Sequence, residues 1–156
     1  MFVFFPLALA AAPTNLNGRW TLDLGASDSV DPLLEAVGAS WTTRQLAAHI
    51  SVTQELTVGS GTLTIAAVSN VGSKTDTVPT DGTATYGKSE FGSGTRRCNW
   101  VGAELHCASH VQVTGGAWGD LTLVRKVDGA GLMHQVYDLK LQDGRAFHAD
   151  RVFRKG

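Results

Sequence analysis

Residues 29–50 read SVDPLLEAVGASWTTRQLAAHI, and they narrow the possible all-β folds because they form the one helical segment in a chain of strand-like segments. Asp31 followed by Pro32 is typical of a helix start, with Asp31 as the N-cap and Pro32 at the first helical position. Gly38 is a natural helix C-cap, and Ser40 can cap a second helix that follows at once. We therefore predict two short helices joined by a tight turn.

Both helices carry apolar residues on one side. Leu33 and Val37 lie one turn apart in the first helix, and Leu46 and Ile50 lie one turn apart in the second. The simplest interpretation is two helices that pack on a core. Because they interrupt a β chain after its first strand, we expect a helix-turn-helix lid over one barrel mouth, with Leu33, Val37 and Trp41 at the portal.

Composition indicates a single domain with few special partners. The chain has 156 residues, of which 43% are hydrophobic and 18 are glycines, and its formal net charge is −1. A chain of this size can bury a substantial core, and the many glycines favour turns between antiparallel strands. Without a basic run, nucleic acid is not an expected partner. No apolar run reaches the roughly 18–20 residues of a membrane span, so stable membrane insertion is not expected either. We expect a monomer.

Alternating apolar and polar residues between turn signals predict ten strands. They cover residues 17–24, 51–58, 62–69, 73–79, 83–89, 95–101, 104–113, 117–127, 132–141 and 145–154. Ten consecutive antiparallel strands tend to close, since closure removes exposed edges. The predicted fold class is therefore all-β: a ten-stranded antiparallel up-and-down β-barrel, large enough to enclose a ligand.

The N-terminus has a different character. Residues 1–12 form an apolar run that ends in small residues, which is typical of a secretory signal peptide, although it lacks a basic beginning. We expect a secreted or periplasmic protein, with a cytoplasmic one as the alternative. Residues 17–156 then form the single folded domain.

Several short motifs, in order and in register, are similar to those of one family. These are Gly18-Arg19-Trp20, the segment 37–48, Leu123-Val124-Arg125 and Arg151-Val152-Phe153. Over about residues 18–155 the chain resembles the intracellular lipid-binding proteins, also called fatty acid-binding proteins. The resemblance implies a barrel that binds a fatty acid or a similar small hydrophobic ligand.

The resemblance also implies particular ligand-binding residues. Arg125 matches the family's arginine in the eighth strand, and Arg151 matches the arginine of an Arg-x-Tyr motif in the last strand. Phe153 stands where that motif has tyrosine, so one hydroxyl is lost. Tyr137, in the ninth strand, could replace this hydroxyl if it faces inward; a position at the barrel rim is the alternative.

Strand alternation supports inward-facing arginines independently. Arg125 shares a face with Leu121 and Leu123, and Arg151 shares one with Ala149. Buried guanidinium groups are costly unless they are paired or hydrated. Few acidic residues fall on inward positions, so we favour an anionic ligand head or water as the partner over an internal ion pair.

Cys98 and Cys107 flank a predicted hairpin whose turn is Gly102-Ala103. Counting back from this turn places the cysteines directly opposite each other in a non-hydrogen-bonded pair, where the Cα atoms are closest. This spacing suits a disulfide in an exported protein. Two neighbouring free thiols are the alternative in a reducing compartment.

The sequence offers no arrangement typical of an enzyme. His106 and His110 lie too far apart on a strand to bind one metal ion, and we expect them to be solvated. No catalytic triad order, zinc spacing or phosphate loop is present, so no metal or cofactor is expected. The favoured function is binding of a fatty acid-like ligand. The alternatives are an enzyme on a similar barrel, with Arg125, Arg151 and Tyr137 as an electrostatic clamp, and a secreted inhibitor or envelope protein with a filled interior.

Overall fold

The strands form one antiparallel sheet of ten in the computed structural model, which describes residues 12–89 and 91–156. They are β1 (Gly18–Asp23), β2 (Val52–Val58), β3 (Thr62–Ser69), β4 (Gly72–Pro79), β5 (Thr85–Ser89), β6 (Gly92–Val101), β7 (Glu104–Gln112), β8 (Trp118–Val127), β9 (Met133–Leu141) and β10 (Ala146–Lys155). Strands adjacent in sequence pair with each other except β4 and β5, and β1 pairs with β10. The predicted ten-stranded barrel is thereby confirmed, with β4 and β5 as the two ends of its sheet.

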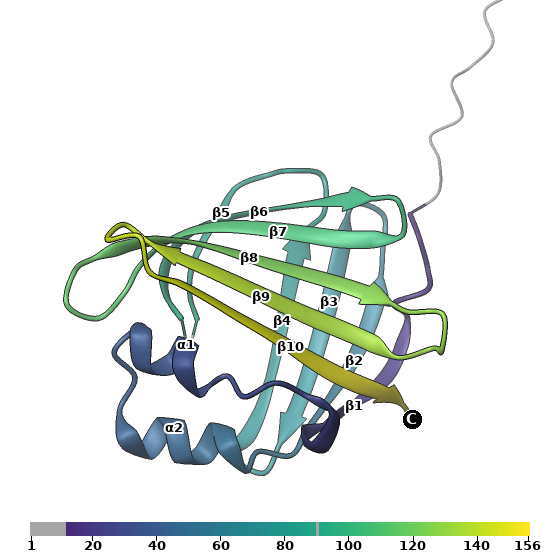
Figure 1. Cartoon of the computed structure of the whole chain (residues 1–156). Helices are drawn as coiled ribbons and strands as arrows, with labels where there is room; N and C mark the ends of the chain where they lie inside the picture. The colour runs from purple at the N-terminus through teal and green to yellow at the C-terminus, as the bar shows by residue number, and fades with distance from the viewer. Residues whose placement is uncertain (1–11, 90) are drawn as a thin grey trace, which may run out of the picture.

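Two helices lie between β1 and β2, as predicted. A short 3₁₀ turn, η1 (Leu24–Ala26), is followed by α1 (Asp31–Ala36) and α2 (Trp41–Ala48). Figure 1 shows both helices together at one end of the barrel. No helix among the described residues is long and apolar enough to cross a bilayer. The apolar run at the N-terminus lies almost entirely outside the described residues.

The predicted start of the first helix is wrong by one residue. Val30 is the N-cap of α1 and has no side-chain capping bond, so Pro32 occupies the second helical position. Asp31 does not cap, because its carboxylate accepts two hydrogen bonds from Arg44 of α2, both at 2.7 Å. Arg44 also lies 3.1 Å from Glu35. This guanidinium therefore ties the two helices together.

The turn between the helices agrees with the prediction. Gly38 has a φ of 78°, and the Ala39 amide donates to the Leu34 carbonyl, as in a Schellman motif. The Ser40 hydroxyl accepts a hydrogen bond from the Thr43 amide and so caps α2. A side chain at position 38 would meet Thr114 of the β7–β8 hairpin, which is a second reason for glycine there.

Two apolar clusters fill the two ends of the barrel. The base cluster consists of Leu16, Trp20, Leu22, Leu56, Leu63, Ile65, Val78, Cys98, Leu105, Cys107, Met133 and Phe153. The lid cluster consists of Val30, Leu33, Leu34, Val37, Phe91, Val111, Val113, Leu121, Tyr137, Leu139, Leu141 and Ala149. The lid cluster joins α1 to the strands β7–β10, so α1 is part of the hydrophobic core.

The two helices contribute unequally to that core. Leu33 and Val37 of the α1 segment are buried, and the Val37 carbonyl accepts a hydrogen bond from the Thr114 amide at 3.2 Å. In α2 no residue is buried, and Trp41 is 71% and Leu46 48% exposed. The expectation that Leu46 packs on the barrel is therefore wrong, because α1 already occupies that contact and α2 is held to α1 through Arg44.

The predicted disulfide is present. Cys98 and Cys107 are direct partners in the register of β6 and β7, their Cα atoms are 4.0 Å apart, and their sulfurs are bonded. Both side chains belong to the base cluster. The bond therefore links the two strands inside the barrel.

On the outer face, His134 of β9 lies between two carboxylates. Its Nε2 is 2.7 Å from Asp128 Oδ2, and its Nδ1 is 2.9 Å from Asp150 Oδ2. The hydrogen bond to Asp128, with a smaller contribution from Asp150, raises the pKa of His134 above its ordinary 6.5 despite partial burial. The same bond lowers the pKa of Asp128 from 3.8.

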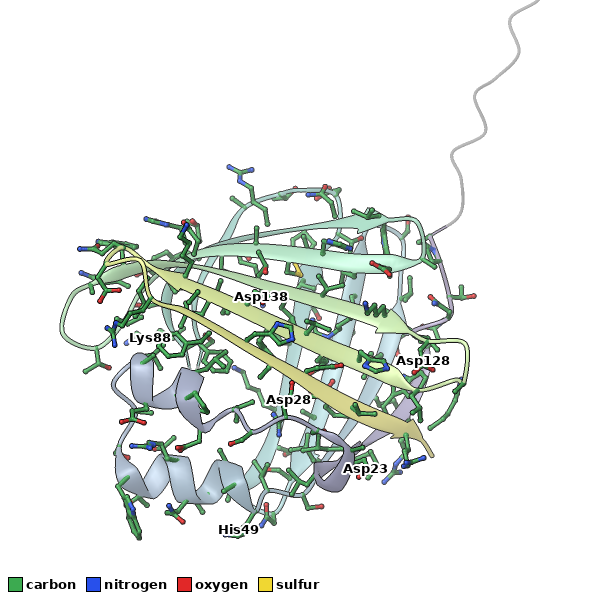
Figure 2. The ribbon with its side chains drawn as sticks, viewed as in Figure 1. Asp23, Asp28, His49, Lys88, Asp128 and Asp138 are labelled. Carbon is green, nitrogen blue, oxygen red and sulfur yellow. A yellow bond between two sulfur atoms is a disulfide. The ribbon has the colours of Figure 1, made fainter. Side chains whose placement is uncertain are left out.

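Asp150, one of the two carboxylates beside His134, is also bonded to Asp28 in the segment that precedes α1. Its carbonyl accepts a hydrogen bond from the Asp28 amide at 2.8 Å, and its own amide donates to Asp28 Oδ2 at 2.9 Å. Figure 2 shows Asp128 near the β8–β9 turn and Asp28 beside β10. The segment that leads into α1 is thus attached to the outer edge of β10.

Truncation of one leucine on each helix tests the unequal roles of α1 and α2. Leu33→Ala should lower the free energy of unfolding by about 2–5 kcal/mol, because it leaves a cavity in the lid cluster. Leu46→Ala, at a half-exposed position, should change it by less than about 0.5 kcal/mol. Urea unfolding of both variants measures the difference. Equal losses would contradict the assignment of α1 alone to the core.

Removal of the disulfide tests its contribution to the fold. The double variant Cys98→Ala/Cys107→Ala should lose about 2–4 kcal/mol of unfolding free energy, because the unfolded chain gains conformational freedom. Thermal unfolding of the reduced wild-type protein provides the matched comparison. Peptide mapping without reductant should recover the two cysteines as one linked peptide, and free thiols in protein from an oxidising compartment would contradict the pairing.

The His134 group predicts a pH dependence of stability. Its raised pKa means that the stabilisation is complete below pH 6.5 and is lost as the pH rises through the folded-state value. The lowered pKa of Asp128 means that its contribution is present above pH 3.8 and is lost as the pH falls through the folded-state value.

His134→Gln should therefore make the unfolding free energy less dependent on pH above 6.5 than in the wild type. Denaturant unfolding across this range measures the slope. His49→Gln, at the exposed end of α2, is the matched control and should keep the wild-type slope. A wild-type slope in His134→Gln would show that the group adds nothing to folding.

Candidate ligand-binding site

A cavity of about 500 Å³ lies inside the barrel between the two apolar clusters. Ile65 and Cys107 of the base cluster line it on one side, and Phe91, Val111 and Leu121 of the lid cluster line it on the other. Pockets for small ligands commonly measure 300–1,000 Å³, so this one is large enough for an acyl chain or a molecule of similar size.

Polar side chains form one wall of this cavity. Gln135 of β9 is 1% exposed, and its Nε2 donates to Gln54 Oε1 of β2 at 2.7 Å. The Tyr137 hydroxyl donates to Gln135 Oε1 at 3.2 Å. The first bond joins β9 to β2, which the sheet separates by β1 and β10, and the second lies within β9. Together they hold three polar groups at the cavity wall, where a ligand head group could contact them.

Arg125 lies beside this polar group. It is 8% exposed, lines the cavity, and is the direct partner of Gln135 in the register of β8 and β9. Arg151 is the partner of Gln135 on the other side, in β10. The inward row Arg125–Gln135–Arg151 thus crosses three neighbouring strands. A guanidinium in a largely buried cavity favours an anionic partner.

The structure separates the four predicted ligand-binding residues into two pairs. Arg125 and Tyr137 are buried on the cavity wall. Arg151 faces inward and is half-buried, but it is not among the described residues that line the cavity. Phe153 is fully buried in the base cluster, where its register partners are Met133 and Leu22.

The predicted portal residues do not reach the cavity. Leu33 and Val37 are buried in the lid cluster, and Trp41 is exposed on α2. Phe91 connects the lid to the site, because it belongs to the lid cluster, lines the cavity, and has its ring centroid 5.2 Å from that of Tyr137. The portal role of these three residues stays a prediction.

Sequence reasoning missed an inward-facing ion pair. Arg96 of β6 lies 3.4 Å from Asp76 of β4, and both line the cavity. Asp76 shares a face with buried Val78, and Arg96 shares one with buried Cys98. The same alternation could have identified them and Gln54 as inward-facing, but the placement of β4 beside β6 is not a local property of the sequence.

The charged side chains along the cavity are mostly cationic. Among the described residues they are Lys74, Lys88, Arg96 and Arg125 against the single carboxylate of Asp76. The described part of the chain contains no group of His, Cys, Asp and Glu side chains suited to a metal ion. The other described histidines on the strands pair with outer-face carboxylates, namely His106 with Glu104, His110 with Asp120 and His148 with Asp138.

Solved structures of lipid-binding proteins share this fold. A fatty acid transporter named REP1-NXSQ has a TM-score of 0.73 and 20% identity, over 92% of this chain and 97% of its own. A Schistosoma mansoni fatty acid binding protein in complex with arachidonic acid has a TM-score of 0.72 and 19% identity, over 94% and 99%. Apo Caenorhabditis elegans lipid binding protein 8 has a TM-score of 0.74 and 15% identity, over 94% and 100%.

The fold is therefore that of the fatty acid-binding barrels, as the sequence motifs indicated. No protein-family model matches the chain, and no curated protein sequence matches it. At these identities the likeness establishes the architecture. The ligand has to be inferred from the cavity and its side chains.

Proposed function

We propose that this barrel binds a fatty acid or a similar small hydrophobic anionic ligand in its cavity, for transport or storage. The observation that carries the proposal is Arg125, a buried cation on the wall of a cavity that lies between two apolar clusters. An acyl chain would fill the apolar part, and its carboxylate would lie near Arg125 and Tyr137.

The acyl chain and the head group of a fatty acid would contribute differently to its binding free energy. Burial of an acyl chain contributes roughly 0.8 kcal/mol per methylene, or about 11 kcal/mol for about 14 methylenes. One charge-assisted hydrogen bond contributes about 1.5–3 kcal/mol. The cost of association lowers the total toward about −8 kcal/mol, a micromolar affinity. The chain thus supplies most of the affinity, and Arg125 selects an acid.

The remaining predicted residues have secondary roles in this proposal. Arg151 lies on the far side of Gln135 and adds positive charge behind the head group. Phe153, two residues after Arg151 in β10, packs in the base cluster and helps to hold this strand in place. Two of the similar structures carry fatty acid names, and one was solved with arachidonic acid, which agrees with an acyl ligand. The disulfide further supports an exported protein, because such bonds persist in oxidising compartments.

The two alternatives predict different observations. A secreted inhibitor or envelope protein with a filled barrel is disfavoured by the cavity of about 500 Å³. An enzyme that used Arg125, Arg151 and Tyr137 as an electrostatic clamp would turn over a ligand and release it. Mass spectrometry of lipid extracted from the purified protein distinguishes a carrier, which retains its ligand, from both alternatives.

Charge selection at the head group can be measured with two ligands. Arg125→Gln should weaken binding of a long-chain fatty acid about tenfold to a hundredfold, because one charge-assisted hydrogen bond is lost. The alcohol of equal chain length should bind almost as before, since burial of the chain is unchanged. Titration with cis-parinaric acid and with the corresponding alcohol gives both dissociation constants.

Arg151→Gln is the matched second variant. It removes the same charge one strand beyond Gln135, so it should weaken the acid less than Arg125→Gln does. Equal losses for acid and alcohol in Arg125→Gln would mean that this arginine serves the fold. No loss for either would place the head group elsewhere.

A further inference from the structure

The wall of the cavity is interrupted between β4 and β5. These strands are the two ends of the sheet and are not hydrogen-bonded to each other. Lys74 of β4 faces inward by alternation with Val78, yet it is exposed, and Gly87 of β5, the register partner of Gly94, also lines the cavity and is exposed. Exposed residues on both sides show that the cavity reaches solvent through this gap.

The gap is closed at one end and bridged in its middle. Near the base cluster, the Gly82 amide donates to the Cys98 carbonyl at 2.9 Å, so the loop after β4 is attached to β6. Further along, the Asp76–Arg96 ion pair crosses from β4 to β6 with side chains that are 40% and 34% exposed. Such a half-solvated pair is weak and can break without exposing apolar surface.

In contrast to the gap, the α1 end of the barrel is held by apolar contacts. Three apolar side chains of the α1 segment, Leu33, Leu34 and Val37, are buried in the lid cluster, and none of them lines the cavity. Movement of α1 away from the barrel would expose all three and break the hydrogen bond between Thr114 and Val37. Separation of β4 from β6 at the ion pair requires no comparable loss of apolar contact.

We propose that the ligand enters and leaves between β4 and β5 while α1 stays in place, with the Asp76–Arg96 ion pair as the latch of this opening. Lys74 and Lys88 lie beside the gap, where they attract anionic amphiphiles. Figure 2 shows Lys88 near the end of the barrel that carries α1. The inference rests on the proposed function, because it assigns a route to the same cavity.

A pair of matched variants separates this route from one through the lid. Asp76→Asn breaks the ion pair across the gap, and Asp31→Asn breaks the corresponding carboxylate contact of Arg44 on the lid. Stopped-flow fluorescence with the alcohol of cis-parinaric acid gives association and dissociation rates without a charge on the ligand. For Asp76→Asn both rates should rise by a similar factor of about twofold to fivefold, as expected for loss of one half-solvated ion pair.

The charge-exchange variant Asp76→Arg/Arg96→Asp restores an ion pair of opposite polarity and should return the rates toward those of the wild type. Asp31→Asn should leave both rates unchanged. Faster exchange in Asp31→Asn, or unchanged exchange in Asp76→Asn, overturns the inference while the proposed function stands. Absence of any binding by the wild-type protein overturns the proposed function and this inference with it.

The role of Lys74 and Lys88 beside the gap can be tested separately, through the rate of ligand association. Lys74→Gln/Lys88→Gln should slow association of cis-parinaric acid about twofold to fivefold at low salt, and the difference should vanish at about 1 M salt, where the screening length falls to about 3 Å. Association of the alcohol should not change. Equal slowing of acid and alcohol would show that the lysines do not select charge at the gap and would overturn that part of the inference.

Discussion

The first and last strands of the chain, β1 and β10, pair with each other, and both the barrel and the placement of its helices follow from this pairing. It joins the first strand to the last through partners such as Leu22 and Phe153, and it turns the four strands β1–β4 and the six strands β5–β10 into one curved sheet. The segment after β1 then passes along β10, where Ser27 and Asp28 bond to its backbone. The position of the lid over the barrel mouth is therefore a consequence of this single strand pair.

Closure of the sheet creates an interior that apolar side chains fill only at its two ends. The lid cluster holds α1 firmly, since burial of Leu33, Leu34 and Val37 contributes on the order of 5–9 kcal/mol. The Asp76–Arg96 pair contributes at most about 1 kcal/mol. The barrel is thus held closed more strongly at α1 than at the gap between β4 and β5.

The polar interior carries a cost that the structure offsets locally. Gln135 is almost fully buried, and its hydrogen bonds with Gln54 and Tyr137 satisfy both ends of its amide. Arg125 stands next to this amide in the register. A network of this kind holds each polar group in one position, so a ligand head group would meet donors that are already oriented.

The order of the elements, the inward faces of the strands and the pairing of Cys98 with Cys107 were all predictable from the sequence. These follow from alternation and turn geometry, which are local properties of the backbone. Three features were not predictable from the sequence: Asp31 binds Arg44 and does not cap, Leu46 faces solvent, and Asp76 pairs with Arg96. The reason is physical: alternation and capping patterns are local, whereas contacts between elements, such as α1 with α2 and β4 with β6, depend on how the closed barrel places those elements beside one another.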